Sequence, residues 1–520
     1  MIRVHGLSLR PDEGEEVLKR QAAAALGVSE KAISDMILRR RSVDARKKPE
    51  VRLVYTVDVA VANEDAILKK HPKLEKAINK TYALPRTDKR PVHRPVVVGF
   101  GPAGLFAALI LAEAGLRPLV LERGKAVEER TAAVQKFWQE GVLDPDCNVQ
   151  FGEGGAGTFS DGKLNTGTHD GRIGWVLEQF AAAGAGQDIL IDAKPHVGTD
   201  VLATVVKNLR ERIISLGGEV CFSAKVDDLI LEDGRLTGLR VNGREIPCDR
   251  LILAVGHSAR DTFELLNGKG VPMEPKPFSM GVRIEHAQKD IDRAQYGRER
   301  DGLPAADYKL NVHLPDGGSA YTFCMCPGGY VVAAASEEGG VVTNGMSNCA
   351  RDGENANAAL LVTLRPEDFP DKDVLGGVRW QREIEQTAFR AGGGNYHAPA
   401  QTVGSFLTGQ DTAPTVTPTY RPGVTWCDLH EVLPRVITGV LEQALPALGR
   451  RLRGFDAPGA VLTAPETRSS SPVRILRGEN CQSALSGLFP CGEGAGYAGG
   501  ITSAAMDGIR CAEALIESLE

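Results

Sequence analysis

Long apolar runs are missing from this sequence: no stretch of about 18 such residues exists that could span a bilayer. Residues 1–10 lack the apolar core of a signal peptide. The 10 cysteines are scattered along 520 residues, without the density of a disulfide scaffold or the paired C-x-x-C spacing of a zinc site. We therefore expect a cytoplasmic protein whose cysteines are mostly reduced and buried.

The net charge is also small, with a formal value of −6. It gives no reason to expect nucleic acid or an anionic membrane as a partner of the whole chain, and a small-molecule substrate is expected instead. A content of 42% hydrophobic and 25% charged residues is typical of a large globular protein. The length allows two or three domains and leaves the oligomeric state open.

The most informative stretch runs from Pro95 to Glu122. A β-branched run, Val96–Val98, predicts a buried strand, and the spacing G-x-G-x-x-G follows it. An apolar helix over about 102–114 and a second strand then lead to Glu122, where an acid can accept hydrogen bonds from an adenosine ribose. Together these features predict a dinucleotide site whose phosphates lie at the helix N-terminus.

The first 90 residues predict a small α+β accessory domain. Ser29 is placed to cap a helix through about Arg40, and a strand over 51–61 follows. The module is locally basic, with three arginines at positions 39–41. A charged run usually forms a solvated face, so a scaffold role is favoured over contact with RNA or an acidic protein.

A dense glycine cluster, FGEGGAGTFSDGKL, occupies residues 151–164. It is not a second nucleotide fingerprint, because no β-branched strand precedes it and no apolar helix follows it. We interpret it as a loop whose bare backbone passes close to a flat cofactor or its phosphates, with Ser160, Asp161 and Lys163 as polar contacts. A flexible surface loop is the alternative.

Three short strand patterns between residues 226 and 247 then predict a β-meander, with an Asn242-Gly243 turn. A buried strand, residues 250–255, follows and ends at Gly256. This order of elements is typical of an FAD-binding domain rather than a simple dehydrogenase: a fingerprint, a helix and a strand come first, and a meander and a returning strand follow.

Eight stretches together resemble the bacterial FAD-dependent dehydrogenases of unassigned substrate, within the superfamily of two-domain flavoproteins built like glutathione reductase and the aromatic hydroxylases. They are GFGPAG (Gly99–Gly104), FGEGGAGTFSDGKL (Phe151–Leu164), LILAVGHSARDT (Leu251–Thr262), KPFSMGVRIEH (Lys276–His286), CMCPGG (Cys324–Gly329), TNGMS (Thr343–Ser347), APETRSSSPVRI (Ala464–Ile475) and LFPCGEGAGYAGGITSAAMDGI (Leu488–Ile509).

The resemblance implies a Rossmann-like FAD-binding domain with a β-meander, an inserted α+β substrate domain and the N-terminal module. The expected boundaries are 1–90 for the module, 95–270 and 460–520 for the FAD-binding domain, and 271–459 for the substrate domain. It also implies that the backbone near Val226 meets the adenine and that Gly492-Glu493 meets the ribitol or pyrophosphate. The turn Gly499-Gly500-Ile501 would present a helix N-terminus to the flavin pyrimidine, where its dipole would stabilise negative charge on reduced flavin.

The predicted cofactor contacts are therefore Gly99, Gly101, Pro102, Ala103, Gly104, Glu122, Arg123, Gly154, Gly155, Lys163, Val226, Gly256, Gly492, Glu493, Gly500 and Ile501. Lys163, Arg283 and Arg468 are the candidate catalytic groups that face the substrate. Arg468 could clamp a carboxylate beside the flavin or form a structural salt bridge. No metal site is predicted.

Cys324 and Cys326 allow either a redox dithiol that passes electrons to the flavin or simple core packing. The second interpretation is favoured, because alternate residues of a strand point to one face and the neighbours are apolar.

The sequence thus predicts an FAD-dependent oxidoreductase, a dehydrogenase or reductase, that transfers a hydride between flavin N5 and a small organic substrate. NAD(P)H is a candidate transient electron donor. A flavin-dependent RNA-modifying enzyme that uses the basic module, a monooxygenase and a non-catalytic scaffold of the same fold remain as alternatives.

Overall fold

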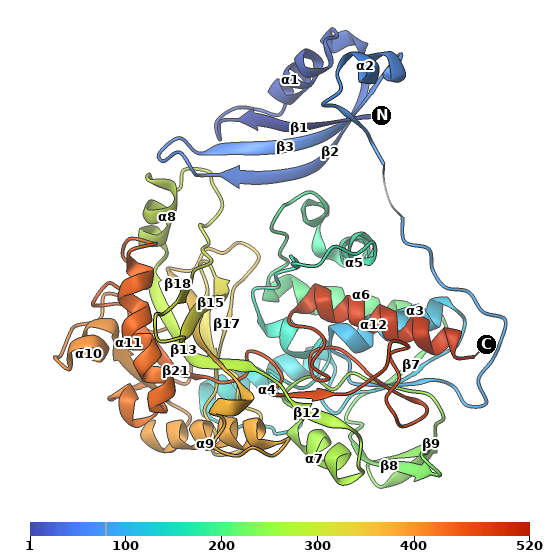
Figure 1. Cartoon of the computed structure of the whole chain (residues 1–520), viewed down its shortest axis with the longest axis vertical. Coiled ribbons are helices and arrows are strands. Elements are labelled where there is room, and N and C mark those ends of the chain that lie inside the picture. The colour runs from blue at the N-terminus through green and yellow to red at the C-terminus, as the bar shows by residue number, and fades with distance from the viewer. Residues whose placement is uncertain (79–80, 520) are drawn as a thin grey trace.

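The computed structural model describes residues 1–78 and 81–519 (Figure 1). It confirms the predicted α/β fold class, with a parallel sheet beside a larger, mainly antiparallel one. Among the described residues no helix is long and apolar enough to cross a membrane.

The N-terminal module is a four-stranded sheet in the order β2-β3-β1-β4. Its elements are β1 (Ile2–Leu9), α1 (Glu16–Leu26), β2 (Ile33–Asp44), β3 (Arg52–Val61), α2 (Glu64–Lys70) and β4 (Glu75–Lys76). The predicted helix from Ser29 to Arg40 is wrong. Only a single 3-10 turn, Glu30–Ala32, precedes β2, because the β2 backbone pairs with β3 along nearly its whole length.

The dinucleotide fold is a five-stranded parallel sheet in the order β23-β11-β5-β6-β7. Its elements are β5 (Val96–Val98), α3 (Pro102–Glu113), β6 (Leu119–Leu121), α4 (Val127–Glu140), α5 (Arg172–Phe180), α6 (Thr199–Ser215), β7 (Glu219–Cys221), β11 (Leu251–Leu253), α7 (Arg260–Gly268), β23 (Leu488–Pro490) and α12 (Ile501–Glu517). The predicted meander is present as β8 (Val226–Glu232), β9 (Arg235–Val241) and β10 (Arg244–Pro247).

Helix α3 explains why this sheet is stable. Ten of its residues are buried, and α12 packs along it, so the helix has almost no polar face. A helix that is apolar all round belongs in the interior of a protein. Its N-terminus is therefore fixed at the carboxyl edge of β5, where a phosphate would lie.

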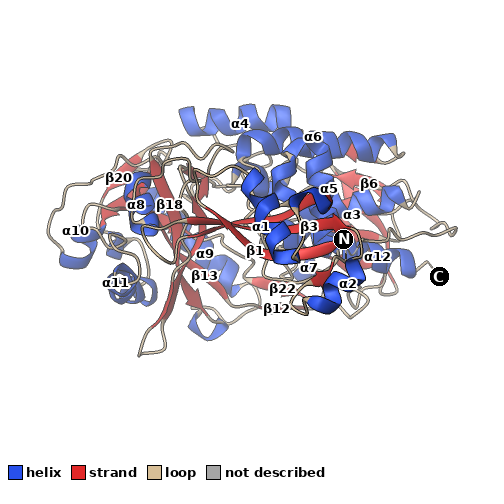
Figure 2. Cartoon of the chain, turned by 90° about the horizontal axis from the view of Figure 1, so that it is seen from above, coloured by secondary structure: helices blue, strands red, loops and turns tan. Residues whose placement is uncertain are grey.

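The larger sheet has the order β14-β15-β18-β13-β21-β19-β20. This region comprises β12 (Met273–Pro275), β13 (Phe278–Ala287), α8 (Gln288–Tyr296), β14 (Asn311–His313), β15 (Ser319–Cys326), β16 (Tyr330–Ala333), β17 (Thr343–Met346), β18 (Asn355–Leu364), α9 (Gly376–Ala391), β19 (Ala398–Thr402), α10 (Val403–Thr408), β20 (Val424–Trp426), α11 (Arg435–Gly449), β21 (Val461–Glu466) and β22 (Val473–Ile475). Figure 2 shows this sheet beside the dinucleotide fold.

One boundary needs correction at this sheet. Strand β21 lies within 460–520, which the sequence analysis assigned to the FAD-binding domain, yet it pairs with β13 and β19. The strand therefore belongs to the larger sheet, and the chain returns to the dinucleotide fold only after it.

Candidate functional site

A cavity of about 550 Å³ lies between the dinucleotide fold and the larger sheet. Its wall includes most of the predicted cofactor residues, which are Gly99, Gly101, Pro102, Ala103, Glu122, Arg123, Gly155, Lys163, Val226, Gly256, Glu493, Gly500 and Ile501. Another part of the wall includes Cys324 and Glu466, from β15 and β21 of the larger sheet, and Asn344 from β17, which pairs with β16 in a separate two-stranded sheet. The two halves of the chain thus share one cavity.

Two glycine loops that line this cavity approach each other. A Cβ at Gly155 would lie 2.9 Å from the Cα of Gly101, and Gly155 has a φ of +60°. A Cβ at Gly101 would find only ordinary contacts, the nearest at 3.6 Å. A Cβ at Gly101 would thus clash with nothing in the protein, and a glycine at this cavity-lining position fits the close approach of a pyrophosphate.

Glu122 connects these loops from the end of β6. Its carboxylate accepts hydrogen bonds from the backbone N–H groups of Phe100 at 2.8 Å and of Gly124 and Gly152 at 2.9 Å. The side chain is buried and also lines the cavity. Glu122 thus holds the fingerprint in place and leaves lone pairs on its oxygens that can accept from a ribose.

Arg130, on α4, is a residue that the sequence analysis missed. Its fully buried guanidinium donates hydrogen bonds to the carbonyls of five residues, which are Asn148, Val149, Gly152, Glu153 and Gly155. Burial lowers the pKa of Arg130 to about 10, which still leaves it charged at neutral pH. The glycine-rich loop is therefore wrapped around one cation.

Three of the predicted cofactor residues lie just behind the cavity wall. Gly104 packs against the fingerprint, since a Cβ there would come within 1.9 Å of the Gly99 carbonyl oxygen. Gly154 donates its N–H to the Phe100 carbonyl at 2.8 Å, and Gly492 donates to Asp507 at 2.7 Å. These glycines shape the loops rather than line the space.

Lys163 points its ammonium group at a buried carboxylate. Its Nζ lies 2.8 Å from Asp161, which also accepts hydrogen bonds from Ser347 and Arg351 of the larger sheet's loops. Burial would lower the pKa of Lys163, but Asp161 raises it above its ordinary value, so the ammonium stays charged. This cluster connects the glycine-rich loop to the segment between β17 and β18.

Arg283 was predicted to face the substrate, but it does not line the cavity. It is fully buried on β13, where its Nε and Nη2 each lie 2.9 Å from Glu466 and its other hydrogen bonds go to Asn344, Asn357 and the Cys324 carbonyl. Three of these partners line the cavity, so Arg283 fixes the wall from behind.

Arg468 does line the cavity, yet its guanidinium is held by Glu385 at 2.8 and 3.0 Å. Glu385 also binds Arg260, on its other side, at 2.8 Å. This geometry matches the structural salt bridge and leaves only part of the guanidinium for a ligand. Burial would raise the pKa of Glu385, but the two arginines bring it well below its ordinary range.

Glu493 and His257 both line the cavity and lie together, with 4.0 Å between His257 Nε2 and Glu493 Oε1. Burial raises the pKa of Glu493 to about 7, and Lys276 opposes this. Burial and the nearby Arg468 and Arg260 lower the pKa of His257 to about 3. The imidazole is therefore neutral at pH 7.

Cys324 and Cys326 of β15 do not share one face of the strand, as regular alternation would predict. The strand has a bulge between Phe323 and Cys326, and Cys324 has a φ of +44°. Cys324 lines the cavity while Cys326 is buried and donates its S–H to the Cys324 carbonyl. A bulge inserts a residue and redirects the side chain, so the two residues no longer share a face by strand alternation.

Comparison with known families agrees with this geometry. A family model described as pyridine nucleotide-disulphide oxidoreductase matches residues 93–290, and one described as FAD-dependent protein, C-terminal domain-like, matches residues 277–469. Residues 1–60 match a domain of unknown function. These matches support an FAD-dependent oxidoreductase.

The chain belongs to the same family as an uncharacterized protein of Clostridium beijerinckii, to which it is 46% identical over 532 residues, covering 100% of this chain and 99% of the relative. Solved structures with similarity include E. coli quinol fumarate reductase, at 13% identity over 84% of this chain and 71% of that chain, with a TM-score of 0.34. Another is L-proline dehydrogenase from P. horikoshii, at 12% identity over 82% and 93% of the two chains, with a TM-score of 0.33.

Proposed function

We propose that this protein transfers a hydride between FAD and a small organic substrate that binds in the same cavity. The observation that carries the proposal is the shared wall. The fingerprint glycines form one end of the cavity, and residues of β15, β17 and the segment after β21 form the other. A substrate in that second part would lie against the flavin, as a transfer between the two requires.

FAD, when bound, supplies the hydride chemistry at N5. The residues placed to hold it are the glycines of the two loops, Glu122 and the backbone at the start of α12. That helix begins at Ile501, directly after Gly500, and both residues line the cavity. Its positive end would favour negative charge on the cofactor beside it.

Lys163 is our candidate for the group that contacts substrate. It is charged, it lines the cavity, and Asp161 holds its position. Arg468 and the neighbouring Ser469 line the same space and would orient a polar or anionic group on the substrate. Arg283 is assigned a positioning role instead, because its contacts act on Glu466 and Asn344.

We further propose that NAD(P)H acts as a transient reductant that enters the same cavity. Anaerobic addition of NADPH or NADH to the holoprotein tests this through the flavin absorbance. Bleaching of the flavin band supports a nicotinamide-driven reductase. A flavin that stays oxidised with both nucleotides contradicts the nicotinamide step and points to a dehydrogenase with another acceptor.

The Lys163→Met variant tests the substrate step separately. Loss of the ammonium is expected to lower the rate at which substrate is turned over by the bound flavin. The flavin itself is expected to stay bound, because Lys163 is one of many residues that line the cavity. Unchanged turnover in a fully flavinated variant would contradict the role of Lys163.

A further inference from the structure

Three charged side chains of the cavity wall form a cluster whose charges do not cancel. Asp161 is buried, and its carboxylate accepts hydrogen bonds from Lys163 Nζ at 2.8 Å and from Arg351 Nε at 2.9 Å. The side chains of Lys163 and Arg351 are only 26% and 12% exposed. Two cations thus share one carboxylate, and the cluster keeps one excess positive charge. We call these three residues the Asp161 cluster.

Titratable groups next to the cluster do not supply the missing negative charge. Burial lowers the pKa of His196 and raises the pKa values of Cys324 and Cys326, so all three stay uncharged at neutral pH. Asp200 and Asp352, the acids of the adjoining segments, are both exposed. Water screens exposed carboxylates, so these two compensate a buried charge only weakly.

The ionic groups that the larger sheet and its neighbouring loops bring to the cavity wall are otherwise balanced. Lys194 pairs with Asp307 at 2.7 Å, and the buried Arg283 likewise has its own carboxylate, Glu466, at 2.9 Å. Lys309 is the exception, but it is exposed and therefore hydrated. A larger network contains three cations and three anions, which are Arg260, Arg382 and Arg468 with Glu264, Glu337 and Glu385. The Asp161 cluster is therefore the place where a buried anion is missing.

The cluster also has unused hydrogen-bond donors. The ammonium group of Lys163 has three N–H bonds and uses two of them, on Asp161 and on the Met325 carbonyl. Arg351 uses Nε and Nη2 on Asp161, and its Nη1 has no hydrogen-bond partner among the described residues. All three residues of the cluster line the cavity, and each Asp161 oxygen already accepts two hydrogen bonds. The unused N–H groups are therefore available to an acceptor in the cavity.

The cluster lies close to the elements between which the proposed function places the substrate. Leu164, directly after Lys163, accepts a hydrogen bond from the Thr502 hydroxyl at 2.6 Å. Thr502 is the second residue of α12, and the N-terminus of this helix is our candidate contact for the flavin. Met325, which accepts from Lys163, belongs to β15 of the larger sheet. A substrate group held by the cluster would thus lie near both the start of α12 and β15.

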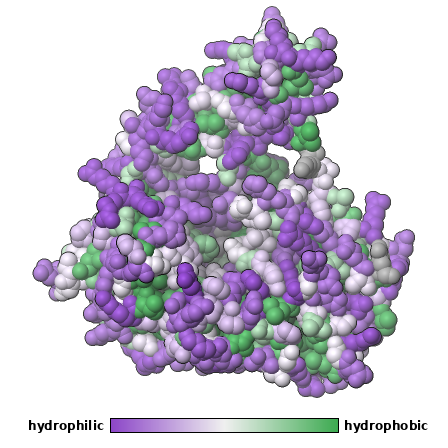
Figure 3. All heavy atoms as spheres, viewed as in Figure 1, coloured by the Kyte–Doolittle hydropathy of each residue, from purple (hydrophilic) through white to green (hydrophobic). Residues whose placement is uncertain are grey.

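A hydrophilic recess borders the cavity wall. Residues 191–193 pair with β2 of the N-terminal module, through Arg41 N to Ile191 O at 2.7 Å and Ala193 N to Arg41 O at 2.9 Å. The next residue along the chain, Lys194, lines the cavity. Figure 3 shows a recess between the module and the body of the molecule, with mostly hydrophilic residues around it. An anion that reaches the cavity from this recess would cross polar surface.

We propose that the substrate carries a carboxylate that binds Lys163 and Arg351 and neutralises the Asp161 cluster. This inference rests on the proposed function, which places the reacting carbon of the same molecule beside the flavin. Buried charges in proteins are normally paired. One negative charge balances the cluster, whereas a phosphate monoester brings about two. FAD does not supply the charge, because its pyrophosphate belongs at the fingerprint and its oxidised ring is neutral.

Line broadening of the acetate methyl proton signal by the FAD-loaded protein tests this. Acetate is a carboxylate small enough to bind without the rest of the substrate. Saturable broadening is expected with a Kd of the order of 10 mM. Acetamide has nearly the same shape and no charge, so its signal should broaden much less. Methyl phosphate, a dianion at about pH 8, is expected to bind no more tightly than acetate.

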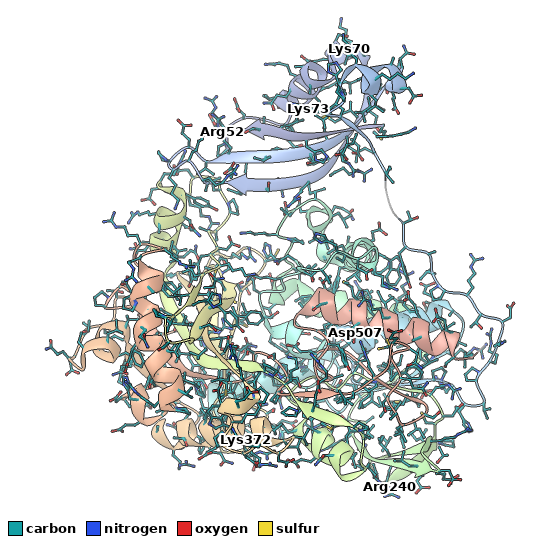
Figure 4. All side chains as sticks on the ribbon, in the orientation of Figure 1. Arg52, Lys70, Lys73, Arg240, Lys372 and Asp507 are labelled. Carbon is teal, nitrogen blue, oxygen red and sulfur yellow. The ribbon has the colours of Figure 1, made fainter. Side chains whose placement is uncertain are left out.

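Variants of Arg351 locate the acetate site. Arg351→Met is expected to weaken acetate binding at least about tenfold, because it removes the excess charge and leaves Lys163 paired with Asp161. Arg351→Lys keeps the charge and should bind acetate more tightly than Arg351→Met. The matched control is Arg240→Met, because Arg240 also pairs with an aspartate, Asp228, but lies on β9 outside the cavity, at the outer edge of the molecule in Figure 4. It is expected to change the Kd less than about twofold.

The proposal is overturned if acetate shows no broadening up to about 100 mM, if acetamide broadens equally, or if Arg351→Met loses no more affinity than Arg240→Met. Tighter binding of methyl phosphate would overturn the assignment to a carboxylate. The comparison of acetate with acetamide uses wild-type protein and does not depend on the folding of a variant. A flavinated protein that does not bind acetate refutes this inference alone. Failure to bind FAD, seen in the absorbance, refutes the proposed function, whatever the FAD-free chain does with acetate.

Discussion

At the scale of single residues, Glu385 lies outside the cavity lining and holds two buried arginines, of which Arg468 lines the cavity. It is almost fully buried between Arg260 and Arg468, and the Thr467 hydroxyl also donates to it at 2.6 Å. Removing its charge would leave two buried guanidinium groups without a counter-ion. Such a change lowers the free energy of unfolding far more than replacing the whole ion-pair network by apolar residues does.

We therefore predict that Glu385→Gln lowers the free energy of unfolding by about 3–5 kcal/mol. Urea denaturation of the purified variant measures this. Glu383→Gln is the control, because Glu383 is exposed on the same helix, and its effect is expected to stay within about 0.5 kcal/mol. Equal stabilities of the two variants would contradict the account of the wall.

Glu493 predicts a dependence of stability on pH. Its folded pKa of about 7 lies above the ordinary value of about 4.3, so between these limits the native state holds a proton that the unfolded chain has released. Stability is therefore lost as pH rises through this window.

In the FAD-free protein, Glu493→Gln removes this loss, because the amide stays neutral. Its gain in Tm over wild type is expected to be larger at about pH 8 than at about pH 5. The exposed Glu479→Gln should show no such difference. A gain that is the same at both pH values would show that Glu493 titrates normally.

The buried Arg130 is expected to affect the affinity for FAD, because it holds the glycine-rich loop that lines the cavity. Arg130→Met would leave five loop carbonyls without their donor, and the loop that lines the cavity would lose its shape. We expect FAD binding to weaken by at least about tenfold, or about 1.4 kcal/mol. Titration of apoprotein with FAD measures it, with the exposed Arg453→Met as control. Wild-type affinity in Arg130→Met would remove Arg130 from the site.

Residues differ in how far the sequence reveals them. The fingerprint glycines and Glu122 were predictable, because their spacing is fixed by one short β-α-β unit. Arg130 and Arg351 were not, since the first acts through main-chain carbonyls and the second reaches Asp161 across 190 positions of sequence. Arg283 was predicted to face substrate because the sequence does not show which side of β13 its ion-pair partner occupies.

At the scale of elements, the turn between β5 and α3 separates two uses of glycine. A Cβ at position 104 would collide with the Gly99 carbonyl at 1.9 Å, whereas a Cβ at position 101 has no neighbour nearer than 3.6 Å. The first glycine serves helix packing, and the second keeps space for the cofactor.

We predict that Gly104→Ala lowers the Tm of the apoprotein, whereas Gly101→Ala leaves that Tm within about 2 °C and weakens FAD binding at least about tenfold. Thermal melts of apoprotein and FAD titrations separate the two effects. Normal FAD affinity in Gly101→Ala would mean that the pyrophosphate lies elsewhere.

Elements were predictable where local pattern and tertiary setting agree. The apolar α3 and the meander meet that condition. The stretch from Ser29 to Arg40 does not, since its capping serine and charged end favour a helix while pairing with β3 and with residues 191–193 imposes a strand. The bulge that redirects Cys324 also depends on the partner strand β18 and has no local signal.

At the scale of the whole molecule, two sheets meet at one cavity, and the N-terminal module is attached beside them through β2 and Val51. The family matches cover the dinucleotide fold and the larger sheet, and the cavity lies where these two meet.

The most direct test of the central claim is the visible spectrum of the purified protein, followed by titration with FAD. The account predicts a flavin absorbance that corresponds to about one FAD per chain, because the described residues form one large shared cavity with a single fingerprint. A colourless protein that cannot be reconstituted with FAD would contradict it.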